Sequence, residues 1–404
     1  MNDLLFLAHR IPFPPNKGDK IRSFNMLKHL AGSFRVHLGS FVDDPHDWQY
    51  QQDVAGYCES VCLLPLSSTR AKIKSLGGLL GSRPLTLPYY ADRRMQQWVN
   101  QRLAGKVDRA LVFSSAMAQY LPPKAPNLHR VIDFCDVDSD KWAQYAQSHR
   151  FPMNQVYRRE ARTLLAYERL IAAQSDAAVF VSEQEASLFR QLAPESAARV
   201  HAIDNGVDTD YFSPDEDYPD PLPGNDAKLV FVGAMDYWAN VDAVIWFVEQ
   251  VFPAIRAARP ATQFVIVGAR PAPEVQRLAQ QDGVVVTGAV HDVRPYLAHA
   301  DIAVAPLRIA RGIQNKVLEA MAMARPVVAT PQALDGLYEC AGPPWNVAET
   351  AGDFARACLD SLNRPAAENA RQGSLGRDCV LSQYSWAEHM DRLVALINTP
   401  GANP

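Results

Sequence analysis

The stretch "ADIAVAPLRIARGIQNKVLEAMAMARPVVAT", residues 300–330, contains the succession of elements from which the fold is predicted. Its apolar runs IAVA and PVVA have the length of strands, and the small-residue segment between them has the length of a helix. A helix that connects two such strands is typical of a parallel sheet. This stretch therefore predicts an α/β domain.

Two charged residues occupy the start of the predicted helix. If the helix begins near residues 312–314, Lys316 lies in its first turn, where the helix dipole disfavours a cation by about 0.3–1 kcal/mol. Glu319 follows three residues later and shares a face with Lys316 and Asn315. We therefore expect an anionic ligand near Lys316. An ordinary surface ion pair between Lys316 and Glu319 is the alternative.

The alternation of strands and helices extends over the whole chain. The strands predicted in the first half are LLFLA, RVHLGSF, SVCLLPL, RALVFS, RVIDF, AAVFVS and RVHAI, and those in the second half are KLVFVGA, TQFVIVGA, GVVVTGA, DIAVAPL and RPVVAT. Acidic and proline residues crowd the segment 204–228 between the halves, as in a linker. Ligands of doubly wound sheets bind beyond the carboxyl ends of the strands.

The predicted organisation is two doubly wound Rossmann-like domains. The N-terminal domain covers residues 1–212, a linker covers 213–227, the C-terminal domain covers 228–384, and a helix and tail cover 385–404. A chain of 404 residues is too long for one ordinary core, which also favours two domains.

Composition restricts the classes of partner. The formal net charge of -4 and the lack of a low-complexity tract argue against a general nucleic-acid-binding protein. No segment approaches the ~20 apolar residues of a membrane span, and the first residues lack the positive region of a signal peptide. We expect a cytoplasmic protein.

The six cysteines show no paired CxxC spacing, so we expect free thiols and no metal site.

One segment has the composition of a lipid-binding surface. RAKIKSLGGLLGSR, residues 70–83, combines four basic residues with leucine and isoleucine and contains no acidic residue. Such a segment can lie on an anionic membrane, which here would be the inner membrane face. A solvated amphipathic helix is the alternative.

The stretch quoted first resembles the C-terminal signature of the group 1 glycosyltransferases, family 4 of the sequence classification. The match covers residues 300–306 and 318–328. The resemblance implies the GT-B fold, in which two Rossmann-like domains face a central cleft. It also implies that Glu319 accepts both ribose hydroxyls of a nucleotide donor and that the helix N-terminus, with Gly312, Gln314 and Asn315, holds the diphosphate.

The chain departs from the family pattern in three ways. Arg311 replaces the first acidic residue of the signature, and Ala324 replaces a glycine. The usual arginine and lysine after the first strand of this domain are also absent. We therefore expect Arg308, Arg311 and Lys316 to meet the charge of the diphosphate. Arg311 suits either a phosphate or the carboxylate of an anionic sugar.

Two further segments resemble one branch of the family, found with exosortase-linked (PEP-CTERM) exopolysaccharide systems. The first is GAMDYWANVDAV, in which Gly233 and Asn240 are expected to contact the donor. The second is HRIPFPPNKGDKIRSFNMLKHLA, residues 9–31, where Gly18 begins a helix and leaves room for a ligand. Asp19 and Arg22 are expected donor-binding residues in the same loop and helix. Asp19 as a simple helix cap is the alternative.

Four aspartates follow the strand in VIDFCDVDSDKW, residues 131–142. Many relatives have a histidine or a His–Asp pair here, and this segment has none. Asp133 or Asp136 is expected to replace it as a catalytic hydrogen-bond acceptor. Capping and solvation account for Asp138 and Asp140, and a metal site is the weaker alternative.

The predicted activity is that of a retaining glycosyltransferase of the hexosyltransferase type, with no cofactor. It would move a sugar from a nucleoside-diphosphate sugar to a saccharide or lipid-linked acceptor in exopolysaccharide synthesis. A GT-B sugar-nucleotide 2-epimerase or hydrolase, or a non-catalytic sugar-nucleotide-binding partner, are the alternatives.

Overall fold

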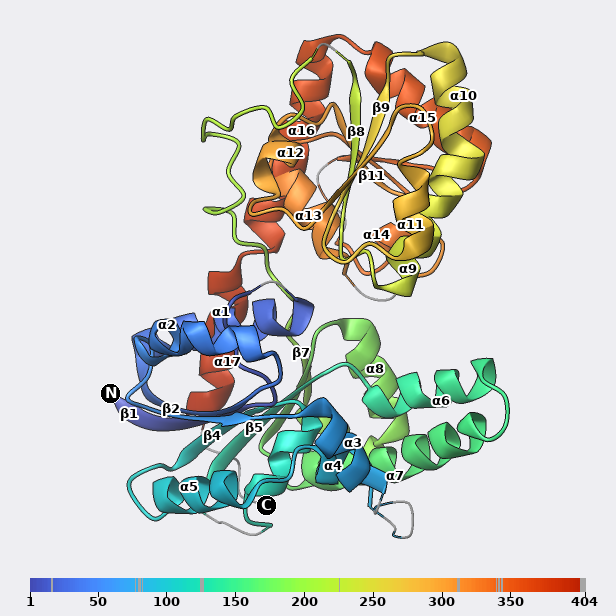
Figure 1. Cartoon of the computed structure of the whole chain (residues 1–404). Coiled ribbons are helices and arrows are strands. Elements are labelled where there is room, and N and C mark those ends of the chain that lie inside the picture. Colours follow the sequence, from blue (N-terminus) through green and yellow to red (C-terminus); the bar gives the residue numbers. More distant parts are fainter. Residues whose placement is uncertain are drawn as a thin grey trace. The chain divides into compact units, whose positions relative to one another are not determined.

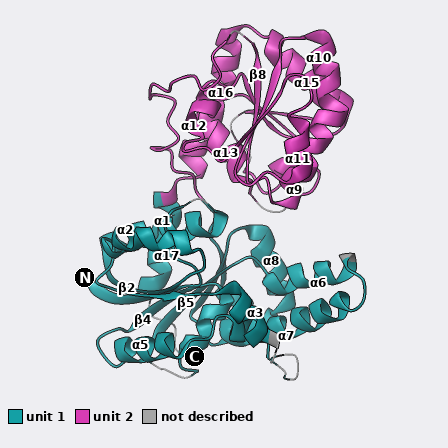
Figure 2. Ribbon diagram, in the orientation of Figure 1, with its two compact units in different colours: residues 1–205, 387–404 teal, residues 206–386 magenta. Residues whose placement is uncertain are grey.

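The computed structural model divides the chain into two compact units. It describes all residues except 16, 77, 79, 80, 82, 124–126, 225, 311, 312, 339, 341, 343 and 400–404. Unit 1 contains residues 1–205 and 387–404, and unit 2 contains residues 206–386 (Figure 2). Each unit has its own parallel sheet covered by helices (Figure 1).

The sheet of unit 1 has seven strands in the order β3-β2-β1-β4-β5-β6-β7. The strands are β1 (Asn2–Ala8), β2 (Phe34–Val42), β3 (Ser60–Pro65), β4 (Arg109–Phe113), β5 (His129–Cys135), β6 (Ala177–Phe180) and β7 (Val200–Ala202). All seven lie within or overlap the predicted apolar runs. The continuous run in β1 reflects its position, because side chains on both faces of a central parallel strand are buried.

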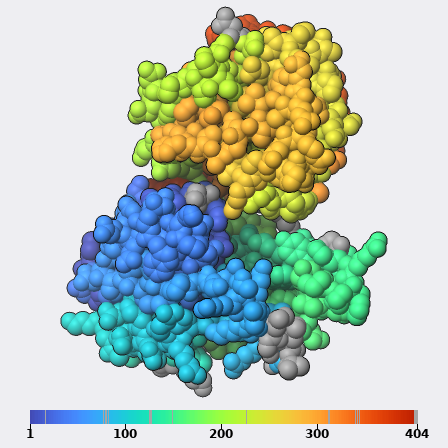
Figure 3. Space-filling view, in the orientation of Figure 1, coloured from blue at the N-terminus to red at the C-terminus, as the bar shows by residue number. Residues whose placement is uncertain are grey.

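Helices cover both faces of this sheet. They are α1 (Gly18–Ser33), α2 (Gln51–Ala55), α3 (Ser68–Leu76), α4 (Thr86–Tyr89), α5 (Arg93–Leu103), α6 (Asp138–Ser148), α7 (Met153–Ala173), α8 (Glu183–Leu192) and α17 (Trp386–Asn398), with short 3-10 turns at Pro45–Tyr50, Ser115–Tyr120 and Pro194–Arg199. Helices α6 and α7 form a hairpin that projects from unit 1, green in the space-filling view (Figure 3).

The sheet of unit 2 has six strands in the order β10-β9-β8-β11-β12-β13. The strands are β8 (Lys228–Val232), β9 (Gln263–Val267), β10 (Val284–Gly288), β11 (Ile302–Ala305), β12 (Val327–Ala329) and β13 (Trp345–Val347). The first five confirm the prediction. The edge strand β13 was missed, because three residues, WNV, give no recognisable apolar run.

The helices of unit 2 include the one predicted from the opening stretch. They are α9 (Trp238–Trp246), α10 (Phe252–Ala258), α11 (Pro273–Leu278), α12 (Arg294–Ala298), α13 (Asn315–Ala322), α14 (Pro331–Leu334), α15 (Ala351–Asn363) and α16 (Ala366–Gln383), with a π-helical turn at Phe247–Val251. Both sheets are parallel and doubly wound, as predicted.

The chain passes twice between the units, after Asn205 and after Trp386. The second passage returns α17 to unit 1, where it buries Met390, Leu393 and Ile397. The first passage lies seven residues before the predicted end of the N-terminal domain. Gly206 already packs against the end of unit 2, since a Cβ there would lie 2.7 Å from the Trp386 nitrogen.

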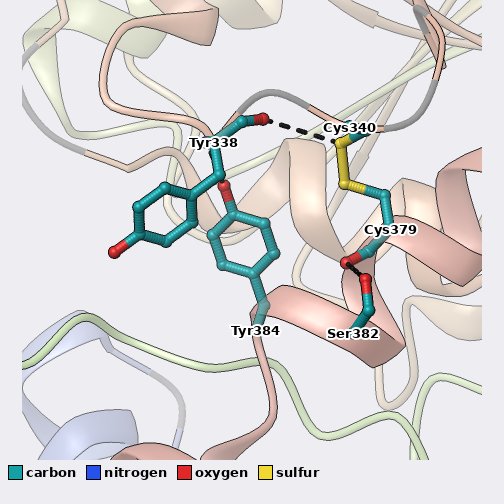
Figure 4. The surroundings of a disulfide bond; sticks show 5 residues. All are labelled: Tyr338, Cys340, Cys379, Ser382 and Tyr384. Carbon is teal, nitrogen blue, oxygen red and sulfur yellow. Dashed lines mark hydrogen bonds between the residues drawn. A yellow bond between two sulfur atoms is a disulfide. The ribbon is translucent and has the colours of Figure 1, made fainter.

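A disulfide bond joins Cys340 and Cys379, and it contradicts the expectation of free thiols only. Cys340 lies in the segment after α14 and Cys379 lies on α16, with their Cα atoms 5.6 Å apart (Figure 4). Tyr338 and Tyr384 flank this bond, and the hydroxyl of Tyr384 accepts a hydrogen bond from the Tyr338 N–H. The two cysteines are 39 residues apart, so sequence spacing gave no sign of their proximity.

Residues 70–76 of the segment predicted to contact lipid lie in α3. Its residues 77, 79, 80 and 82 lie outside the described residues. Ile73 on α3 is 65% exposed and has basic neighbours in the sequence. Among the described residues, no helix is long and apolar enough to cross a bilayer.

Candidate functional site

In unit 2 the strand order reverses between β8 and β11, so the loops that follow these two strands diverge. Such a switch point is where open parallel sheets bind ligands. The loop after β8 leads into α9, and the segment after β11 leads into α13 (Figure 1). The predicted donor residues of unit 2 lie on these two connections.

A chain of hydrogen bonds links α13, α9 and the end of β8. Lys316 Nζ donates to Asn240 Oδ1 at 3.0 Å, and Asn240 Nδ2 donates to the Ala234 carbonyl at 2.9 Å. The second bond fixes the orientation of the amide, so its oxygen faces the ammonium group. The Lys316 ammonium also lies 5.3 Å from the centre of the Phe231 ring. Lys316 is therefore held in place before any ligand binds.

Two glycines allow this arrangement. A Cβ on Gly233 would lie 2.8 Å from Asn240 Nδ2, and a Cβ on Gly268 would collide with the Gly233 carbonyl. The amide of Asn240 and the ends of β8 and β9 can approach each other only without these side-chain atoms. Gly233 was predicted from the sequence, and Gly268 was not.

Glu319 and Lys316 are partly withdrawn from water. Burial lowers the pKa of Lys316 to about 8, and it raises the pKa of Glu319 to about 7 against the opposing effect of the Lys316 charge. Within the described part of the chain, no group donates a hydrogen bond to the Glu319 carboxylate. Desolvated groups with few partners are typical of a site that a ligand completes.

Two arginines, Arg308 and Arg311, were expected beside Lys316 to meet the charge of the diphosphate. Arg308 forms a bidentate ion pair with Asp242 on α9, so its charge is already balanced within the protein. Arg311 and Gly312 lie outside the described residues. Arg270, after β9, is a cation at this edge that the sequence did not suggest, and it pairs with Asp236 at 3.0 Å.

Helix α13 begins one to three residues after the predicted start at residues 312–314. Gln314 is the N-cap residue, and the helix begins at Asn315. Asn315 Oδ1 is buried and has no hydrogen-bond partner among the described residues. Buried oxygen atoms in proteins are rarely left in this state.

In unit 1 the loop after β1 leads to α1, which begins at the predicted Gly18. Gly18 is exposed, its φ is not in the left-handed region, and a Cβ there would meet nothing within 4 Å. The fold of the described residues therefore does not explain the glycine. A ligand that approaches the backbone would explain it.

Arg22 and Asp133 are not where their predicted roles require them. Both side chains are fully buried, and Arg22 Nη2 lies 2.6 Å from Asp133 Oδ2. The other Asp133 oxygen accepts the Cys135 N–H at 2.9 Å, and Arg22 also donates to Asn205 Oδ1. This ion pair joins α1 to β5 in the interior. Neither side chain presents an atom to a donor or a sugar, which corrects the prediction.

The remaining charged residues of these segments are also paired. Lys20, in the first turn of α1, is buried with Asp47 at 2.5 Å. Lys141 lies 2.6 Å from Asp136 and 3.3 Å from Asp138. Asp136 keeps about a third of its side chain exposed. Of the two predicted catalytic aspartates, only Asp136 is accessible.

His9 is a functional candidate that the sequence reasoning passed over. It follows β1 directly and approaches Asp19, with His9 Nε2 3.4 Å from Asp19 Oδ2. Asp19 also pairs with Arg10 at 2.5 Å. The sequence prediction considered a histidine only in the segment after β5. The position of His9 directly after a central strand is the signal that could have identified it.

Comparisons with known proteins agree with this architecture. Residues 226–364, within unit 2, match the family model described as "Glycosyl transferases group 1". No curated protein matches the sequence.

Solved structures resemble the chain over nearly its whole length. The sucrose-phosphate synthase from Thermosynechococcus elongatus has a TM-score of 0.70 at 17% identity, covering 98% of each chain. HepE from Anabaena, in complex with UDP and glucose, has a TM-score of 0.66 at 14% identity, covering 98% of this chain and 99% of its own. WaaG, a glycosyltransferase involved in lipopolysaccharide biosynthesis, has a TM-score of 0.66 at 16% identity, covering 98% and 100%. These likenesses show that the fold is the two-domain GT-B fold.

Proposed function

We propose that this protein is a glycosyltransferase that binds a nucleoside-diphosphate sugar in unit 2 and transfers the sugar to an acceptor hydroxyl. The observation that carries the proposal is the hydrogen-bonded Lys316–Asn240 pair beside Glu319, at the switch point between β8 and β11. It lies in the part of the chain that matches the group 1 family model. HepE, which has a similar fold, was solved with UDP and glucose, which supports a nucleotide-sugar donor.

The two charged groups suit two parts of such a donor. The Lys316 ammonium, held by Asn240, would contact the diphosphate, where negative charge grows as the sugar departs. The Glu319 carboxylate would accept hydrogen bonds from the ribose hydroxyls. A ligand of this kind would compensate the desolvation of both groups at once, because it brings negative charge to the lysine and donors to the glutamate.

The finer details are proposals of the same kind. A retaining reaction needs no covalent protein nucleophile, and the departing diphosphate would help to deprotonate the acceptor. The resemblance of the sequence to family 4 and to the exosortase-linked branch supports a lipid-linked saccharide acceptor in exopolysaccharide synthesis. The basic, partly exposed helix α3 would bring the enzyme to an anionic membrane.

Replacement of Lys316 tests the diphosphate contact. Lys316→Ala should reduce turnover about 10²-fold, the scale of losing one preorganised charge contact, with the unfolding temperature unchanged or raised. Arg356→Ala, on an exposed arginine of α15, is the matched control and should leave turnover unchanged. Near-wild-type turnover of Lys316→Ala would contradict the role given to the lysine.

Replacement of Glu319 tests the ribose contact. Glu319→Ala should weaken donor binding by about ten- to a hundredfold, because two hydrogen bonds to a charged group are lost. Calorimetric titration measures this affinity, and Glu368→Ala on the exposed side of α16 is the control. An unchanged dissociation constant would exclude the contact.

The donor is identified by a thermal-shift screen of nucleoside diphosphates and their sugars, since a ligand that binds the native state raises the unfolding temperature. The selected sugar nucleotide is then incubated with and without lipid-extract acceptors. Rapid conversion of the donor without an acceptor would indicate an epimerase or hydrolase instead. Tight donor binding without turnover on any acceptor would indicate a non-catalytic binding protein.

A further inference from the structure

Helix α9 of unit 2 exposes aromatic residues to solvent. Its nine residues, WANVDAVIW, include a single charged residue, Asp242. A helix that is apolar on all sides is normally buried, yet Trp238 is 50% exposed and Trp246 is only partly buried. Tyr237, directly before the helix, is 54% exposed, and its ring centre lies 6.1 Å from that of Trp238. The packing of unit 2 therefore does not account for the aromatic residues of this segment.

Trp238, Asp242 and Trp246 form one row along α9. They are spaced by four residues, so each is a neighbour of the next on the helix surface. The two tryptophans are eight residues apart, which is about 12 Å along the helix axis. The Trp246 ring meets the ring of Phe354 on α15 edge-on, with centres 6.1 Å apart, and this contact fixes its orientation. The row thus presents two rings with a carboxylate between them.

Arg308, in the segment after β11, pairs with the middle of this row. Its Nε donates to Asp242 Oδ2 at 3.0 Å, and its Nη2 donates to Asp242 Oδ1. The guanidinium carbon lies 6.0 Å from the centre of the Trp246 ring. Both charged side chains are partly exposed, and they have more N–H donors and lone pairs than their two mutual bonds use. We call Trp238, Asp242, Trp246 and Arg308 the α9 ridge.

A second ion pair precedes Trp238 in the chain. Asp236 Oδ2 lies 3.0 Å from Arg270 Nε, and both side chains are about half exposed. Arg270 has φ 53°, a left-handed conformation that few residues other than glycine adopt. Trp238 therefore lies between two partly exposed carboxylate–arginine pairs, at Asp236 and at Asp242.

The chemistry of the α9 ridge restricts the ligand. The electron-rich face of an aromatic ring attracts the C–H groups on the apolar face of a sugar ring. A sugar hydroxyl both donates and accepts hydrogen bonds, so it can bind either member of an ion pair. Each pair has no net charge, and it therefore gives no advantage to an anion. A lipid chain or an apolar protein surface would strip water from the ion pairs, which is costly.

We propose that the α9 ridge binds a neutral oligosaccharide, with sugar rings stacked on Trp238 and Trp246 and hydroxyls bonded to the Asp242–Arg308 pair. The separation of the two tryptophans exceeds the length of one sugar ring, so the ligand is a disaccharide or longer. Helix α9 also contains Asn240, which holds Lys316. A role in holding the part of a growing saccharide that does not react rests on the proposed function, whereas the binding itself does not.

Substitutions of Trp238 test the stacking contact. Binding is measured without any donor, by calorimetry of the full chain with neutral trisaccharides of glucose, galactose and mannose. At least one of them should bind, and its methyl monosaccharide, which covers only one ring, should bind at least tenfold more weakly. Trp238→Ala should weaken trisaccharide binding at least tenfold, and Trp238→Tyr, which keeps a ring, should stay within about threefold of wild type. Phe151→Ala, which removes an exposed aromatic residue of unit 1, is the control and should change nothing.

Substitution of Asp242 tests the role of the neutral ion pair. Wild-type protein should bind the neutral trisaccharide more tightly than trigalacturonate. Asp242→Asn leaves the charge of Arg308 unbalanced, so it should weaken the neutral ligand at least threefold and shift the preference toward trigalacturonate. The unfolding temperature should be unchanged, because the pair is partly exposed.

Three results would overturn the proposal. They are the absence of binding by every neutral trisaccharide, wild-type affinity in Trp238→Ala, and a wild-type preference for trigalacturonate. Sedimentation with phosphatidylglycerol vesicles and light scattering test the other occupants of this surface. Loss of vesicle binding or of self-association in Trp238→Ala, without saccharide binding by the wild type, would assign the α9 ridge to a lipid surface or a second copy of the chain instead.

A transfer assay separates the oligosaccharide site from the proposed function. With the donor found by thermal shift, Trp238→Ala should raise the KM of the bound trisaccharide as acceptor at least fivefold and leave the calorimetric affinity for the donor within about threefold. Transfer in which neither acceptor KM nor saccharide binding depends on Trp238 would overturn the oligosaccharide site alone. Absence of transfer by the wild-type protein, together with trisaccharide binding that depends on Trp238, would overturn the proposed function alone.

Discussion

Lys316 and Glu319 should give nucleotide binding a pH optimum. The ligand-free protein loses the Lys316 charge as the pH rises above about 8, and Glu319 takes up a proton as the pH falls below about 7. Donor affinity should therefore be highest between pH 7 and 8 and fall about tenfold per unit well outside that range. Calorimetry across pH checks this. Lys316→Arg should remove the alkaline decline, Glu319→Gln should remove the acidic one, and a flat wild-type profile would contradict both roles.

The same two residues make the ligand-free fold less stable where binding is best. Glu319 has its pKa raised from 4.5, so its contribution to stability falls as the pH rises from 4.5 to about 7. Lys316 has its pKa lowered from 10.5, so its contribution recovers only as the pH rises from about 8 to 10.5. The free energy of unfolding of unit 2 is thus reduced by this pair between pH 7 and 8. The donor restores it by binding.

Asp133 and Asp136 should respond differently to the same substitution. Asp133→Asn leaves the buried Arg22 guanidinium without its counter-charge, which should cost about 3–5 kcal/mol of unfolding free energy. Asp136→Asn removes a half-exposed ion pair with Lys141, and it should cost about 0–1 kcal/mol. Denaturant titrations measure both. An Asp133→Asn protein of normal stability that lacks turnover would restore the catalytic role predicted from the sequence.

For single residues, the sequence identified candidate charged side chains better than it identified the side chains that they contact. The spacing of Lys316 and Glu319 on one helix was readable because both lie on a single element. The partner of Arg22 is 111 residues away, and no local pattern reveals that the two side chains meet in the interior. The same holds for His9, whose neighbours are Tyr90, Phe113 of β4 and Asp19 of α1.

Helix α13 is followed by a residue in the left-handed backbone conformation, Ala324. Ala324 has φ +52°, and the Ala324 and Arg325 N–H groups bond to the Met321 and Ala320 carbonyls, the pattern of a left-handed helix C-terminus. Glycine is favoured at such a position, which is where the family signature has it. The Ala324 carbonyl also packs on Gly373 of α16, where a Cβ would collide with it.

Ala324→Gly should therefore stabilise unit 2. Relief of the left-handed conformation should raise the unfolding free energy by about 0.5–1 kcal/mol, or the unfolding temperature by about 1–4 °C. The control is Ala370→Gly at an exposed position within α16, which should lower the unfolding free energy by about 1 kcal/mol. Equal destabilisation by both substitutions would show that Ala324 is not strained.

Elements with long apolar runs could be predicted, and those without them could not. The predicted strands were recognised because central parallel strands are buried on both faces. Strand β13 has three residues, none of them buried, and so lacks that signature. The Cys340–Cys379 bond joins two elements whose proximity depends on the packing of α16 against unit 2.

Removal of residues 387–404 should destabilise one unit and spare the other. These residues contain most of α17, whose buried Met390, Leu393 and Ile397 belong to unit 1, and His129 Nε2 lies 2.8 Å from the Leu396 carbonyl. Differential scanning calorimetry should show the transition of unit 1 lowered or lost, while that of unit 2 persists and still shifts with nucleotide. Removal of 400–404, which leaves α17 whole, is the control. Loss of the nucleotide response in the 1–386 protein would contradict the placement of the donor site.

For the whole molecule, the sequence predicted two domains but not the unit to which the last helix, α17, belongs. The apolar spacing in residues 385–397 identified a helix with a buried face, and it contained no sign of which core that face joins. The proline-rich segment 213–227 suggested a boundary, yet the chain already packs against unit 2 at Gly206. Where a chain crosses between units depends on tertiary contacts that composition does not record.

The return of α17 also sets an order of events during translation. All residues of unit 2 are synthesised before those of α17, so the core of unit 1 lacks this helix until unit 2 has been made. For the whole synthesis of unit 2, the surface of unit 1 that receives Met390, Leu393 and Ile397 is bare. The nascent protein thus completes unit 2 before unit 1. Because unit 1 without α17 exposes apolar surface, we expect it to be the intermediate most in need of a chaperone.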